Sequence, residues 1–77
     1  MNAIKVECYA GYKGDQRPVR FFLNDRVLEV MDIEDRWYSP SARYFRVRAS
    51  DGNTYVLNYN EDNDTWNLSA YRKTLNS

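Results

Sequence analysis

The sequence predicts an all-β fold, a single small domain of about six antiparallel strands in a meander that forms a curled sheet or small barrel. Several segments alternate apolar and polar residues with a period of two, as strands with one buried face do. Turn signals at Asn24-Asp25 and Asp51-Gly52 separate such segments. With only 77 residues, the open edges of a flat sheet would need cover, which favours closure.

Residues 17–30 predict a hairpin with a two-residue turn at Asn24 and Asp25, which as a type I′ turn would need positive φ at both residues. The expected register pairs Leu23 with Arg26, Phe22 with Val27, Phe21 with Leu28, Arg20 with Glu29 and Val19 with Val30. The residues expected to share the core face are Val19, Phe21, Leu28 and Val30. Opposite charges also face each other across this register, which favours it over a one-residue slip.

The alternation changes after Val30, because continuing it would bury Asp32 and Glu34. A bulge or sharp bend near Met31 restores the pattern. The alternative is an α+β fold, in which residues 26–37 form an amphipathic helix. The two interpretations differ in whether this segment pairs with its neighbours as a strand.

The same alternation predicts the other strands, with a loop over residues 10–16 after the first of them. A three-residue loop over residues 50–52 sets Phe45 opposite Leu57 and keeps the apolar faces together. The predicted core consists of Phe21, Leu28, Val30, Phe45, Val47, Leu57, Trp66 and Leu68. Trp37 is expected to be buried as well, because a small domain needs the area of its large aromatic side chains.

We expect one domain over residues 1–71, followed by a flexible tail over residues 72–77. Eleven basic and eleven acidic residues give zero net charge, so no global field attracts nucleic acid or an anionic membrane. Cys8 is the single cysteine, which excludes an internal disulfide, and no signal peptide or transmembrane segment is present in the sequence. The expectation is a cytoplasmic protein without a membrane partner, either a monomer or a weak homodimer.

The sequence gives little support for catalysis. It contains no histidine, and the alternation makes Cys8 a core thiol. The carboxylates of Asp32, Glu34 and Asp35 could share a face, but such groups are more often solvated or paired with a neighbouring arginine. The acidic loop over residues 60–64 lacks the glycine and the bidentate glutamate of a calcium-binding loop. We therefore expect no enzymatic activity, metal or cofactor.

The candidate binding residues lie on the predicted fourth strand. Tyr44, Arg46 and Arg48 alternate with its apolar residues, and Arg43 adds a further guanidinium group. An aromatic ring beside several cations is typical of surfaces that bind single-stranded nucleic acid on small barrels. The same pattern is also typical of a solvated outer face whose charges are neutralised by nearby carboxylates.

A set of short motifs spans residues 4–70. It comprises Tyr9-Ala-Gly-Tyr12, Arg17-Pro18 with Phe21, Asp35-Arg-Trp-Tyr38, Tyr44-Phe-Arg-Val47, Asp51-Gly52 with Tyr55, and Trp66-Asn-Leu68. This set resembles a family of small, uncharacterised bacterial cytoplasmic proteins. The resemblance implies a cytoplasmic location, and it carries over no activity, ligand or site residue.

Two functional hypotheses follow. The first is a non-enzymatic β binding module for a protein or nucleic-acid partner that uses the face of the fourth strand. The second is a structural or assembly domain that acts through sheet-edge pairing or homodimerisation. Salt-dependent oligonucleotide binding would favour the first hypothesis, and a concentration-dependent mass would favour the second.

Overall fold

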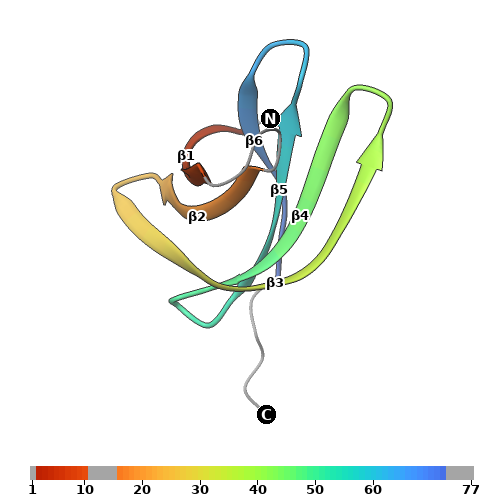
Figure 1. Cartoon of the computed structure of the whole chain (residues 1–77). Coiled ribbons are helices and arrows are strands. Elements are labelled where there is room, and N and C mark those ends of the chain that lie inside the picture. The colour runs from red at the N-terminus through yellow and green to blue at the C-terminus, as the bar shows by residue number, and fades with distance from the viewer. Residues whose placement is uncertain (1, 11–15, 73–77) are drawn as a thin grey trace.

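The protein is a small closed barrel (Figure 1), seen in a computed structural model that describes residues 2–10 and 16–72. Its strands are β1 (Asn2–Ala10), β2 (Gln16–Leu23), β3 (Arg26–Ser39), β4 (Ala42–Ala49), β5 (Thr54–Asn60) and β6 (Thr65–Arg72). Each strand pairs antiparallel with the next, and β1 also pairs with β6. The predicted meander and its closure are confirmed. The alternative helix over residues 26–37 is wrong, because that segment lies within β3.

Parts of two predicted segments, the loop after the first strand and the C-terminal tail, fall at positions 11–15 and 73–77, outside the described residues. The part of the chain that the structure describes contains no helix that could cross a membrane.

The long strand β3 belongs to both halves of the barrel. Its first four residues, Arg26 to Glu29, pair with β2, and the rest of the strand pairs with β4. Relative to β4 it carries one extra residue at Met31 and another at Glu34. The bulge predicted near Met31 is therefore confirmed, and Met31 is 64% exposed. Two bulges let one strand bend from one sheet into the other.

The structure confirms the predicted β2–β3 register at its four pairs nearest the turn. The prediction that Val19 faces the core is wrong, because Val19 is the extra residue of a bulge in β2. Glu7 pairs with Arg20, whereas the next residue, Cys8, pairs with Pro18. The bulge reverses the side-chain alternation, so Pro18 is buried and Val19 is exposed.

The β2–β3 turn differs from the expected type I′ geometry. Asn24 has a φ of 57°, whereas Asp25 is not among the described residues with positive φ. A two-residue turn in which only the first central residue has a positive φ matches a type II′ turn rather than a type I′ turn. The conformational strain therefore lies at Asn24, and the prediction that placed it also at Asp25 is wrong.

The β4–β5 loop has the predicted three residues, Ser50, Asp51 and Gly52. The Ala49 amide donates to the Asn53 carbonyl at 2.9 Å, which closes the loop. Gly52 has a φ of 87°, so glycine occupies the left-handed position for which its missing side chain is needed. This loop sets Phe45 opposite Leu57, as the sequence predicts.

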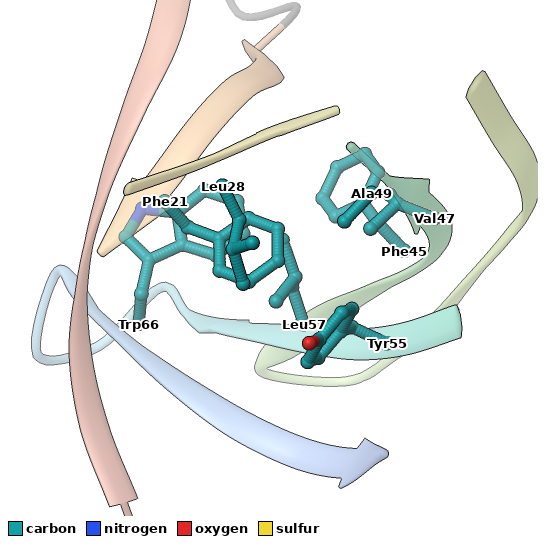
Figure 2. Packing of buried hydrophobic residues seen from close by; sticks show 8 residues of the cluster. All are labelled: Phe21, Leu28, Phe45, Val47, Ala49, Tyr55, Leu57 and Trp66. Atoms are coloured by element: carbon teal, nitrogen blue, oxygen red, sulfur yellow. The ribbon is translucent and has the colours of Figure 1, made fainter. Parts of the chain in front are cut away.

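Buried aromatic and aliphatic side chains from five strands fill the barrel interior (Figure 2). The fully packed cluster contains Phe21, Leu28, Phe45, Val47, Ala49, Tyr55, Leu57 and Trp66. The rings of Phe21 and Tyr55 meet edge to face at 5.0 Å between centroids, and those of Phe45 and Trp66 lie 5.7 Å apart. Six of the eight predicted core residues are buried, and the other two, Val30 and Leu68, are half-buried against the cluster.

Replacing Leu57 by alanine is expected to lower the free energy of unfolding by about 2 to 5 kcal/mol, because it leaves a cavity in a closed core. Denaturant unfolding measures the loss. Val27→Ala is the control, since Val27 is also an apolar strand residue but is 54% exposed, and its cost should stay within about 0.5 to 1 kcal/mol. Equal losses for the two variants would contradict the assigned inner face.

The turn geometry predicts opposite responses to glycine at its two positions. Asn24→Gly should relieve the left-handed backbone, whereas Asp25→Gly only adds freedom to the unfolded chain. We expect the Asn24 variant to be the more stable by roughly 0.5 to 1 kcal/mol, because the unfolded-state effect of glycine cancels in the comparison. Urea midpoints of the two variants measure it. A higher midpoint for Asp25→Gly would restore the type I′ turn.

Candidate functional site

The predicted binding residues on β4 divide between its two faces. β4 contains no bulge along its pairing with β5, so alternation holds throughout the strand. Phe45 points into the core, which places Tyr44, Arg46 and Arg48 on the outer face and Arg43 on the opposite one. The structure therefore brings three of the four predicted residues together.

Carboxylates of β3 face the two outer arginines of β4. Arg46 Nε lies 3.6 Å from Glu34 Oε1, and Arg46 Nη2 lies 3.9 Å from Asp35 Oδ2. Arg48 Nη2 lies 3.8 Å from Asp32 Oδ2, and Arg48 Nη1 lies 3.9 Å from Glu34 Oε2. Glu34 reaches both arginines because it is the extra residue of a bulge between the two paired positions. The outer face of β3 and β4 therefore carries charges of both signs, with two arginines against three carboxylates.

Two aromatic contacts lie where the β3–β4 hairpin turns: one is a stack of two rings, and the other is a cation–π contact. Trp37 stacks on Tyr44 on the outer face, with centroids 5.5 Å apart and planes 3° from parallel. On the other face, the Arg43 guanidinium lies 5.8 Å from the centroid of the Tyr38 ring, and its Nε donates to Glu61 at 2.6 Å. We call Trp37, Tyr38, Arg43 and Tyr44 the hairpin tip.

The prediction that Trp37 belongs to the core is wrong. Its side chain is 39% exposed and that of Tyr38 is 65% exposed, whereas Trp66 is buried as predicted. All residues of β3 from Glu34 onward are exposed, because the strand continues beyond the part of the barrel that holds the core. The sequence did carry a signal, since pairing outward from a turn at Pro40 would have placed Trp37 opposite Tyr44.

A shallow depression of about 550 Å³ lies on the outer face beside Glu34 and Arg46. Its lining includes the small apolar side chains of Val56 and Ala70, which follow Arg46 in register across β5 and β6. The outer face thus combines an aromatic stack, paired charges and a shallow apolar depression.

A hydrogen-bonded network orders the β4–β5 turn at the other end of the barrel. The Asp51 carboxylate accepts from the Tyr55 hydroxyl at 2.6 Å and from the Asn53 backbone and side-chain amides at 3.0 and 3.1 Å. Burial alone would raise the pKa of Asp51, but these bonds and the Arg26 charge outweigh it and lower the pKa. Burial and the bond to Asp51 raise the pKa of Tyr55 to about 12. These bonds tie the turn together.

The groups considered for catalysis have other roles. Asp32, Glu34 and Asp35 lie in the ion pairs with β4, so their partners are Arg46 and Arg48. Cys8 is half-buried against the core, and desolvation raises its pKa, which disfavours the reactive thiolate.

The acidic loop over residues 60–64 forms a turn held by its own side chains. The Asn60 side chain accepts from the backbone amides of Asp62 and Asn63, and the Tyr59 hydroxyl donates to Asp64 at 2.6 Å. Within residues 2–10 and 16–72, no group of three or more cysteine, aspartate or glutamate side chains could hold a metal ion.

Comparison of the chain with protein families, curated proteins and solved structures finds no match. The resemblance drawn from the aromatic and glycine motifs stays a prediction, and the function rests on the chain's own geometry.

The Asp51 network predicts a specific dependence of stability on pH. The pKa of Asp51 is lower in the folded protein than in the unfolded chain. The stability that its carboxylate contributes is therefore fully present when the pH is above the pKa of the unfolded chain, and it is lost as the pH falls through the pKa of the folded protein. Asp51→Asn should cost about 1 to 3 kcal/mol at pH 7, and this difference should shrink below about pH 4. Urea unfolding at pH 7 and pH 3 measures it, with the exposed Asp62→Asn as control. A difference that grows in acid would contradict the assignment.

Proposed function

We propose that the protein is a non-enzymatic binding module whose partner is another protein, contacted by the hairpin tip and the outer face of β3 and β4. The exposure of Trp37 and Tyr38 carries this proposal. A domain of 77 residues has little apolar area to spare, yet it leaves the neighbouring Trp37 and Tyr38 outside its core; Tyr9 and Tyr71 are exposed elsewhere on the barrel. Tryptophan, tyrosine and arginine are the residues most enriched at the energetic centres of protein interfaces.

The charge arrangement favours a protein over a nucleic acid. Phosphate groups would have to compete with Asp32, Glu34 and Asp35 for the outer guanidinium groups of β4. The net charge of zero supplies no long-range attraction that would help them. A protein surface with charges of both signs can match the alternating arginines and carboxylates without displacing them.

Assembly through a strand edge is the second candidate, and the edge of β3 beyond Glu29 favours it. This part of β3 pairs only with β4 among the described residues. However, the same edge carries two bulges and four charged residues, Asp32, Glu34, Asp35 and Arg36. Bulges and charges are devices that prevent edge-to-edge pairing. The tip therefore supports the proposal better than the edge does.

The proposal needs no cofactor, and we place the protein in the cytoplasm, where a single unpaired cysteine such as Cys8 is usual.

A photo-crosslinking amino acid in place of Ser39, beside the hairpin tip, can identify the partner in cells. With that partner purified, Trp37→Ala and Tyr38→Ala should each weaken binding by at least about tenfold, as truncation of a central interface aromatic does. Titration calorimetry measures the affinities. Tyr9→Ala is the matched control, because Tyr9 is 62% exposed on β1 and is not part of the tip.

Three outcomes would contradict this assignment. Equal affinities for the tip variants and the control would remove the tip from the interface. Tight, salt-dependent binding of a labelled single-stranded oligonucleotide, lost in a variant carrying Arg46→Ala and Arg48→Ala, would favour nucleic acid instead. A mass that rises with concentration in light scattering, in the absence of other proteins, would favour self-assembly.

A further inference from the structure

A cleft of about 900 Å³ opens at the end of the barrel opposite the hairpin tip. It forms because β1 changes partner: Asn2 to Ile4 pair with β6, whereas pairing with β2 begins at Lys5 and Phe22. The first residues of β1 therefore separate from the β2–β3 turn. Clefts of this size at the mouths of barrels are common sites for small ligands.

The walls of the cleft combine polar and apolar surface in similar shares. Ile4, Leu23 and Leu68 line it and are half-buried against the core cluster, and Tyr55 lies deeper. Their exposed parts lie next to the packed interior, so an apolar group placed there would extend the core outward. Removing this surface from water would stabilise a bound apolar group.

The charged side chains that line the cleft are both cationic, Lys5 and Arg26. Among the described residues, Lys5 has no carboxylate within ion-pair distance, and its ammonium lies 5.5 Å from the centre of the Phe22 ring. No aspartate or glutamate lines the cleft. The lining therefore carries two positive charges, of which Arg26 is paired with Asp51 and Lys5 is not paired with a described carboxylate.

Arg26 keeps hydrogen-bonding capacity for a ligand. Its Nη2 lies 3.3 Å from Asp51 Oδ2, the one ion pair of Arg26 among the described residues, and its side chain is 59% exposed. Asp51 already accepts hydrogen bonds from Tyr55 and Asn53, so it does not depend on Arg26 for its satisfaction. A guanidinium has five N–H donors, and a carboxylate can accept two of them side by side.

We propose that this cleft binds a small amphipathic organic anion, with its apolar body against Ile4, Leu23 and Leu68 and its carboxylate facing Arg26, which pairs directly with Leu23. Lys5, on the opposite face of β1 from Ile4, adds a second positive charge to the lining. The three apolar side chains favour an apolar body, and the two cations favour a negative charge at its polar end. This site lies at the other end of the barrel from the hairpin tip. Its test is therefore independent of the test of the proposed protein contact.

The test compares decanoate with 1-decanol, which has the same carbon chain and no charge, below the concentrations at which they aggregate. Calorimetry should show one decanoate per protein, bound at least tenfold more tightly than decanol. Lys5→Met combined with Arg26→Met should weaken decanoate binding at least tenfold and abolish the preference over decanol. Arg36→Met is the matched control, because it removes an exposed arginine of β3 outside the cleft.

Ala3→Trp tests the location without removing a cation or a core side chain. Ala3 is exposed and lines the cleft, so a larger side chain there should obstruct it and weaken decanoate binding at least tenfold. A thermal melt shows whether the variant is folded. The proposal is overturned if decanoate shows no saturable binding, if decanol binds equally well, or if the folded Ala3→Trp variant binds decanoate unchanged.

Discussion

Two strands that each change partner hold this barrel closed. β3 pairs with β2 as far as Glu29 and with β4 from Val30 onward, while β1 pairs with β6 as far as Ile4 and with β2 from Lys5 onward. A strand shared in this way must bend, because its two halves lie in different sheets. The small interior follows from these bends, since they bring side chains of opposite sheets together around Leu57.

The sequence predicted the parts of this fold that depend on short-range pattern. Alternation and turn residues were enough for the hairpin registers, because each register is determined by its turn and by which face is apolar. The bulge at Val19 was missed because its partner strand lies across a long connection, and because the local signal from Pro18, a residue typical of bulges, was not used. The position of Trp37 was missed for another reason: its residue type indicates burial, but the strand extends beyond the core.

The sequence pointed to the β4 residues of the candidate site, but not to Trp37 and Tyr38 of β3 or to the charge pairing of the face. The sequence showed the arginines of β4 and the carboxylates of β3 as separate groups, and only the register places Glu34 between Arg46 and Arg48. Such exposed pairs contribute little to stability, about 0 to 1 kcal/mol each. Their larger effect is on the surface potential, because they convert a cationic strand into a face of mixed sign. That change favours a protein partner for this face.

The two changes of partner also account for the two proposed sites. In β3 the bend is made with extra residues, and the bulge at Glu34 turns the strand outward until Trp37 and Tyr38 pass beyond the core. In β1 the change of partner falls between Ile4 and Lys5. No bulge lies at this point, since the bulge in the β1–β2 pairing is further along, between Glu7 and Cys8. The neighbouring strands separate there and leave the cleft. The barrel thus closes over a core too small to cover both ends, and each uncovered end presents apolar surface next to charged side chains.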